Sequence, residues 1–234
     1  MSNFNQEEFN KFVAYGDIIG FYDKPKELKF GRMSNLYINW RKQVEDVAGA
    51  EILAKNIINF TLDKGLDPCT FYGVPEGATI IGIITQYQWA KKADVYGPGT
   101  HSFSMGRGKP KEHGDIKDKY FVGVPKGKTI IIEDVTTTGG SLLNEIDRLQ
   151  EANIEVIAAY GLTNRMERRD DGLTVKEAVA KKGVEYYALS TADVLLPMAI
   201  AHKKPSNHIL QELEKEFKEH GVEALAAIEL TKQL

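Results

Sequence analysis

The sequence predicts an α/β protein whose mostly parallel sheet is covered by helices on both faces, with a small hood from the terminal segments. Two observations favour this fold class. Short apolar runs alternate with longer amphipathic segments from residue 46 onward. Several of these runs are apolar at every position, which is typical of strands buried on both faces of a sheet. The composition, 42% hydrophobic and 27% charged among 234 residues, excludes disordered, collagen-like and coiled-coil proteins.

The first helix of the sheet unit is predicted over residues 46–65, where apolar residues recur at helical spacing between Ala50 and Ile58. A short apolar strand over 69–74 and a turn rich in glycine and proline follow. Residues 78–92 are predicted to form a buried helix, because apolar residues cover most of its circumference.

The same alternation continues through the second half of the chain. The predicted elements are strand 129–132, helix 141–153, strand 154–162, helix 173–183 and strand 184–190. Because short strands here alternate with helices, the strands are expected to run parallel.

The terminal segments 5–23 and 205–221 are both predicted to be helical and to pack on the sheet unit. No composition break, linker or internal repeat separates them from the middle, so residues 1–234 are expected to form a single domain. Residues 206–234 are expected to be a C-terminal helical extension, and about 106–120 a flexible loop.

Charge and cysteine content narrow the choice of partners. Thirty Lys and Arg against 33 Asp and Glu give a net charge of -3, so no nucleic-acid partner is expected. The single cysteine, Cys69, excludes a disulfide framework and a cysteine-ligated zinc site, and is expected to be inert core. The first residues lack a secretory signal pattern, and no uncharged apolar run reaches about 18 residues. We therefore expect a cytoplasmic protein without a membrane partner.

The densest functional signal is the segment TIIIEDVTTTGGS, residues 129–141. An apolar strand leads into Glu133 and Asp134, and a turn of threonines and glycines follows at a helix start. Glycines allow backbone N–H groups to surround an anion, and the helix N-terminus adds partial positive charge. Two carboxylates would repel a bare phosphate unless they face sugar hydroxyls or magnesium, so a sugar phosphate is the predicted ligand. The alternative is a plain connection with solvated acids and capping threonines.

Two other segments have the composition of anion sites. Residues 107–119 hold five basic and three acidic residues, with His113 in addition, in a glycine-rich stretch that could close as a lid. The alternative there is a solvated, charged turn. The turn FYGVPEGAT, residues 71–79, leads into a helix start and could meet diphosphate oxygens.

The 129–141 segment resembles the ribose-phosphate and diphosphate-sugar signature of the type I phosphoribosyltransferases. Three further segments are similar to orotate phosphoribosyltransferases and occur in the same order: ELKFGRMSNLYINWRK (27–42), RGKPKEHG (107–114) and GLTNRMER (161–168). The resemblance spans most of residues 27–169. It implies the type I fold and transfer of a phosphoribosyl group from 5-phosphoribosyl 1-diphosphate (PRPP) to orotate, which gives orotidine 5'-monophosphate and diphosphate in pyrimidine biosynthesis.

The resemblance also implies roles for individual residues. PRPP would be bound by Lys29, Arg107, Lys109, Lys111, His113, Glu133, Asp134, Val135, Thr136, Thr137, Thr138, Gly139, Gly140 and Ser141. Orotate would be bound by Tyr37, Ile38, Thr137 and Arg165, and the catalytic residues would be Lys111, His113 and Asp134. Mg²⁺ would arrive on the diphosphate without a dedicated protein metal site. A homodimer with shared active sites is implied, because the family's mobile loop reaches the neighbouring subunit.

The chain departs from the family pattern at two positions. Glu76 stands where many members carry a lysine, and Gly108 where a second basic residue is expected. Two other functions therefore remain open: a phosphoribosyltransferase for another nucleobase, and a non-catalytic regulator that binds PRPP. Residue alternatives also remain: Arg165 as a surface arginine paired with Glu167 or Asp170, Lys29 as a turn residue, and Tyr37 as part of a half-buried strand.

Overall fold

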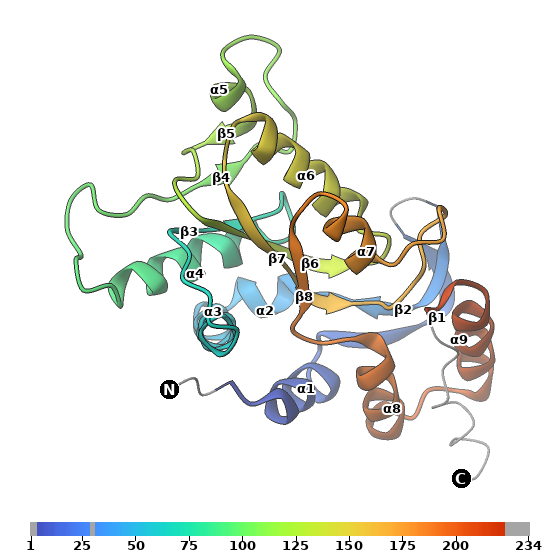
Figure 1. The fold of residues 1–234 in the computed structure, drawn as a ribbon. Coiled ribbons are helices and arrows are strands. Elements are labelled where there is room, and N and C mark those ends of the chain that lie inside the picture. The colour runs from blue at the N-terminus through green and yellow to red at the C-terminus, as the bar shows by residue number, and fades with distance from the viewer. Residues whose placement is uncertain (1–3, 29–30, 223–234) are drawn as a thin grey trace.

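The computed structural model describes residues 4–28 and 31–222, and its centre is a four-stranded parallel sheet (Figure 1). The strand order is β3 (Thr70–Gly73), β6 (Thr129–Thr136), β7 (Val156–Asn164) and β8 (Glu185–Ala188). All three neighbouring pairs are parallel. The predicted α/β class with a parallel sheet is therefore confirmed.

Helices cover both faces of this sheet, as its continuous apolar strands predict. The helices that follow β6 and β7, α6 (Gly140–Glu151) and α7 (Val175–Ala180), pack on one face, together with the side chain of Ile131. Ile130 and Ile132 point to the opposite face, where they join a larger core. That core includes side chains from α1 (Gln6–Tyr15), α3 (Val47–Asp63), α4 (Thr79–Lys91) and α8 (Ala192–Lys203).

The hood is a β-hairpin packed against the C-terminal helix. Strands β1 (Ile19–Glu27) and β2 (Met33–Ile38) pair antiparallel, and α9 (Asn207–His220) lies against both (Figure 1). The prediction of a helix over 5–23 is wrong beyond Tyr15, because the chain turns at Gly16 and buries Ile18 and Ile19 in the hairpin and core instead. The helical extension is confirmed to His220, and residues 223–234 lie outside the described residues.

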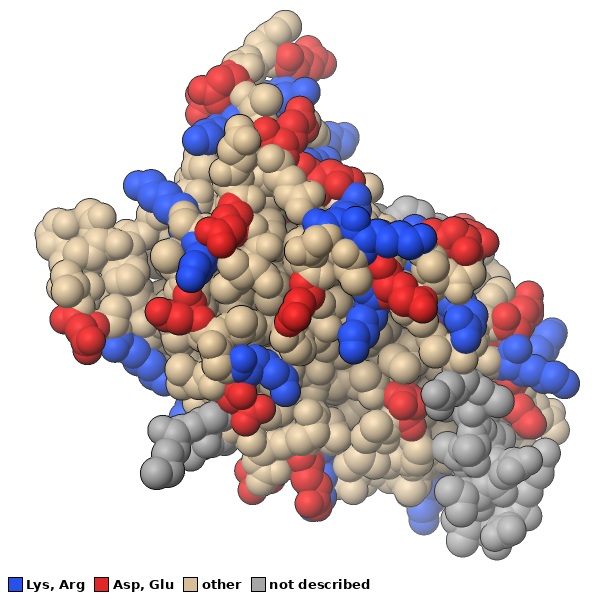
Figure 2. Space-filling view, in the orientation of Figure 1, with Lys and Arg blue, Asp and Glu red and all other residues tan. Residues whose placement is uncertain are grey.

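The predicted loop near 106–120 projects from the body of the molecule (Figure 1). A short antiparallel pair, β4 (Met105–Gly106) and β5 (Phe121–Val122), closes its base, and the single-turn helix α5 (Ile116–Tyr120) occupies one side. Acidic and basic side chains are interspersed over the face in Figure 2, including the projection. None of the helices in the described ranges combines the length and the apolar character that a membrane crossing requires.

Candidate active site

The segments that follow β3 and β6 meet at the carboxyl edge of the sheet, since these two strands are neighbours. This edge is where ligands bind in open parallel sheets. A cavity of about 150 Å³ lies between the two segments. It is lined by Arg41, Pro75, Glu76, Gly77, Glu133, Asp134, Val135, Thr137, Thr138, Gly139, Gly140 and Ser141.

Local backbone geometry explains the glycines on the β6 side of the cavity. Gly139 has a φ of 71°, in the left-handed region, and α6 begins at the next residue. A Cβ on Gly139 would also lie 3.1 Å from Cγ1 of Val175, so space and conformation both require glycine. The cavity therefore lies at the N-terminus of α6, where the backbone N–H groups and the helix dipole suit an anion.

The predicted acidic pair lies on the same cavity. Glu133 is buried and Asp134 is half-buried. The Asp134 carboxylate lies so close to Gly77 that any Cβ at Gly77 would overlap it. Glu133, Asp134, Val135 and the 137–141 turn are thus brought together as predicted.

Thr136 is the exception in this run. Its side chain is buried on the α6 face, and its hydroxyl shares a 2.6 Å hydrogen bond with the hydroxyl of Tyr186. The Thr136 hydroxyl is thus engaged in a buried structural contact, and Thr136 is not among the residues that line the cavity. Burial, as the largest cause, raises the pKa of Tyr186, so its phenol is neutral in this pair.

The basic residues of the projecting segment do not line this cavity. Arg107, Lys109, Lys111 and His113 are not among the residues that line it, and the last three are exposed. Gly108 is close, however, because a Cβ there would lie 3.1 Å from Oε1 of Glu76. The two positions that depart from the family pattern are therefore neighbours in space.

Arg165 follows β7 and is 2% exposed, with each guanidinium nitrogen bound to protein. Its Nε donates to Glu167 at 2.7 Å and one terminal nitrogen to the carbonyl of Leu36 at 3.1 Å. The other terminal nitrogen donates to Glu216 of α9 at 2.7 Å and to Ser34 at 2.8 Å. These contacts use four of the five N–H groups of Arg165, and its contact with orotate stays a prediction. The alternative pairing with Glu167 is observed, but the pair is buried and not at the surface.

Glu167 and Glu216 both form ion pairs with Arg165, and Arg32 forms a second ion pair with Glu167. Arg32 donates to Glu167 at 3.0 Å and to Asp170 at 2.7 Å. Burial raises the pKa of Glu216, and the charge of Glu167 raises it further, while Arg165 opposes the shift. The cluster fastens β2 and α9 to the carboxyl end of β7.

The predicted orotate-flanking pair lies in the hairpin of the hood. The hydroxyl of Tyr37 donates to the carbonyl of Asp17 at 2.8 Å, and its ring packs at 5.3 Å from that of Tyr22. Ile38 is partly buried against the larger core. The alternative of a half-buried strand is thus confirmed for Tyr37, and Lys29 lies outside the described residues.

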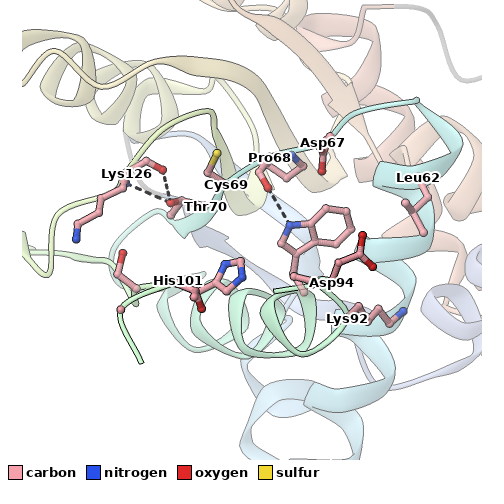
Figure 3. A pocket seen from close by; sticks show the side chains of 14 residues that line it. Leu62, Asp67, Pro68, Cys69, Thr70, Lys92, Asp94, His101 and Lys126 are labelled. Atoms are coloured by element: carbon pink, nitrogen blue, oxygen red, sulfur yellow. Dashed lines mark hydrogen bonds between the residues drawn. The ribbon is translucent and has the colours of Figure 1, made fainter. Parts of the chain in front are cut away.

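A larger cavity, of about 540 Å³, lies at the opposite edge of the sheet, where β3 begins (Figure 3). Trp89 forms part of its wall and donates its indole N–H to the carbonyl of Pro68 at 2.8 Å. Cys69 lies at this cavity and is exposed, so the expectation that it is core is wrong. The amino edge of a parallel sheet is not where such folds bind substrates, and the smaller cavity is the candidate active site.

Sequence reasoning missed one lining residue, Arg41, which begins the short helix α2 (Arg41–Glu45). No spacing in the sequence marks it, because the hood brings it to the cavity only after folding. Across the described ranges, no group of three or more His, Cys, Asp or Glu side chains is placed to hold a metal ion.

Comparison with known proteins gives matches in sequence and in structure. An orotate phosphoribosyltransferase of Bradyrhizobium sp. (strain ORS 278) is 32% identical over 173 residues, covering 70% of this chain and 84% of that protein. One from Pyrococcus horikoshii is 29% identical, covering 76% and 88%. The orotate phosphoribosyltransferase structure from Francisella tularensis has a TM-score of 0.65 at 16% identity, over 92% of this chain and 99% of that one. No protein-family model matches the chain.

A parallel sheet that carries an acidic pair and a glycine-rich helix start at its carboxyl edge, under a hairpin hood, defines a type I phosphoribosyltransferase. The sequence matches refine this class. The chain belongs to the orotate phosphoribosyltransferase family.

Proposed function

We propose that this protein transfers the phosphoribosyl group of PRPP to orotate, giving orotidine 5'-monophosphate and diphosphate. The observation that carries the proposal is the single cavity in which Glu133 and Asp134 meet the glycine-rich start of α6. The relatives named orotate phosphoribosyltransferase support orotate as the base.

The cavity residues suit the parts of such a reaction. Displacement at C1 of the ribose builds positive charge on the sugar, and a carboxylate at this point stabilises it. Glu133 and Asp134 would hold the ribose hydroxyls, and the Asp134 carboxylate lies against Gly77 of the opposite turn. The 137–141 turn would hold the 5-phosphate through backbone N–H groups and hydroxyls, and Thr137 would also contact the base.

The diphosphate needs positive charge that the cavity supplies poorly. Arg107, Lys109, Lys111 and His113 are proposed to supply it, with Mg²⁺ entering as part of the PRPP complex. When bound, Mg²⁺ offsets the negative charge that develops on the departing diphosphate.

The projecting segment supports a homodimer in which these cations serve the partner's cavity. Segment 106–120 extends from the body, and its exposed cations do not line the cavity of their own chain. Near its base, α4 and the chain after it expose large apolar side chains that a second subunit could cover. These are Ile80, Tyr87, Val95, Tyr96 and Phe103.

We also propose a cytoplasmic location. The single cysteine, which is exposed, suits a reducing compartment.

Incubation with Mg²⁺, PRPP and a panel of free bases tests the proposal. We expect consumption of orotate and release of diphosphate, with little turnover of adenine or uracil. A Lys111→Ala variant should lose most turnover while its binding of ribose 5-phosphate persists, because Lys111 is assigned to the leaving group. Turnover of another base alone would contradict the choice of orotate. PRPP binding without any turnover would identify a non-catalytic regulator.

A further inference from the structure

Arg41 differs in charge from the other side chains of the proposed active-site cavity. Among the described residues that line this cavity, it is the only lysine or arginine, whereas Glu76, Glu133 and Asp134 are carboxylates. A substrate with several phosphate groups would therefore enter a cavity whose lining side chains are negative on balance. Arg41 is the one permanent positive charge among the described side chains that line it.

The backbone that carries Arg41 is held firmly. Trp40 is buried, stacks on Phe9 with ring centroids 6.0 Å apart, and donates its indole N–H to the hydroxyl of Thr163 on β7 at 3.1 Å. The side chain of Asn39 accepts a hydrogen bond from the backbone N–H of Arg41 at 3.0 Å. These contacts fix the backbone position from which the Arg41 side chain extends at the start of α2.

The guanidinium of Arg41 is uncommitted, in contrast to that of Arg165. Within the part of the chain that the structure describes, it makes no hydrogen bond and no ion pair, and the residue is exposed. The guanidinium of Arg165, by comparison, has a protein partner on all three nitrogens. A guanidinium on a fixed backbone, without a protein partner among the described residues and beside an anion-binding cavity, is suited to bind an anionic ligand.

The two sides of the cavity differ in what they offer an anion. The 137–141 side has backbone N–H groups and hydroxyls at the start of α6, so a phosphate there is already provided for. The opposite turn offers Pro75, which has no N–H group, and the carboxylate of Glu76. An anion on this second side would therefore gain most from the charge of Arg41, which lines the same cavity.

We propose that Arg41 binds the diphosphate group of PRPP, as a cation supplied by the same subunit as the acidic pair. This inference rests on the proposed function and adds a residue to it. Arg41 would hold the leaving group before the projecting segment closes on it. It would also compensate for the negative charge of Glu76.

Isothermal titration with magnesium diphosphate and, separately, with ribose 5-phosphate tests the assignment. Arg41→Gln should weaken diphosphate binding by about tenfold to a hundredfold, as for a lost charge-assisted contact, and leave ribose 5-phosphate binding within about twofold. Arg41→Lys should retain part of the affinity, because it keeps the charge and loses the planar fork. In turnover, KM for PRPP should rise in Arg41→Gln while KM for orotate stays unchanged.

Lys42→Gln is the matched control, because it removes a neighbouring exposed charge on the same helix that does not line the cavity. It should change neither affinity. Equal losses for both ligands in Arg41→Gln, or no loss for either, would overturn the assignment to diphosphate. If the unaltered protein binds neither PRPP nor diphosphate, the proposed function fails first, so the two failures are distinguishable.

Discussion

At the scale of single residues, two arginines near the carboxyl edge of the sheet have opposite surroundings. Arg165 is enclosed by Glu167, Glu216 and two oxygen atoms of β2, so its charge is used within the protein. Arg41 is exposed at the start of α2, beside the cavity. Arg165 holds the end of β7 against β2 and α9, and its contact with the base stays a prediction.

The buried cluster around Arg165 leads to a pH prediction. Burial raises the pKa of Glu216, so the folded protein favours its protonated form more than the unfolded chain does. The resulting stability is fully present below the unfolded value of about 4.3 and is lost as pH rises through the higher folded pKa. Glu216→Gln cannot ionise. Urea unfolding between pH 4 and 7 should show wild type losing stability relative to this variant as pH rises.

Subtracting the unfolding free energy of Glu216→Gln from that of wild type at each pH cancels the contributions of the ionisable groups that both proteins contain. A difference in unfolding free energy that is independent of pH would contradict the raised pKa. A difference that grows in favour of wild type as pH rises would show that Arg165 holds Glu216 ionised.

Residue types predicted part of the site and missed the rest for a clear reason. Glu133, Asp134 and the 137–141 turn are consecutive, so the chain itself brings them together. Arg165 matches the family segment in sequence, but its partner Glu216 lies 51 residues away, and no local sequence pattern predicts that contact. Arg41 depends in the same way on how the hood folds onto β7.

At the scale of elements, periodicity predicted the sheet unit well and the hood poorly. The helix predicted over 46–65 is observed as Val47–Asp63, and the strand predicted over 129–132 continues to Thr136 because Glu133 to Thr136 pair with β7. The apolar residues after Gly16 look helical in sequence, yet the hairpin partner β2 decides their structure. Pairing between strands is a non-local interaction, and the periodicity of a single segment does not predict it.

The start of α6 provides a prediction at this scale. Gly139→Ala forces alanine into a left-handed conformation and places its Cβ 3.1 Å from Val175, next to the cavity. We expect a loss of about 1–2 kcal/mol in unfolding free energy from the backbone alone. We also expect weaker binding of ribose 5-phosphate, since the first turn of α6 must shift. Urea denaturation and calorimetry measure the two effects.

Gly172→Ala is the control for backbone strain. Gly172 has a φ of 80°, but a Cβ there would meet no atom within 4 Å, and the residue does not line the cavity. This variant should lose comparable stability and keep its affinity for ribose 5-phosphate. If Gly139→Ala bound ribose 5-phosphate as tightly as wild type, ligand binding by the 137–141 turn would not depend on the geometry at the start of α6.

At the scale of the whole molecule, the cavity and the projecting cations are separated within one chain. The cavity lies at the carboxyl edge of the sheet, whereas segment 106–120 extends outward (Figure 1). The start of the segment approaches the cavity wall, because a Cβ on Gly106 would lie 2.6 Å from Cγ of Pro75 and one on Gly108 would lie 3.1 Å from Oε1 of Glu76. Catalysis by one chain would require the segment to fold back, while a dimer would bring a partner's segment to the site.

Mixing two inactive variants distinguishes these arrangements. Lys111→Ala keeps the acidic pair and loses a loop cation, and Asp134→Asn has the reverse defect. In a mixed dimer with shared sites, one of the two cavities combines an intact Asp134 with an intact Lys111 from the partner. Random exchange of subunits should therefore restore about a quarter of wild-type turnover, since half of the dimers are mixed and each has one complete site. If each chain served its own cavity, every site would keep one defect and no activity would return. Native mass spectrometry must show the mixed dimers, because inactive mixtures that contain them would refute sharing and a purely monomeric protein would refute the dimer itself.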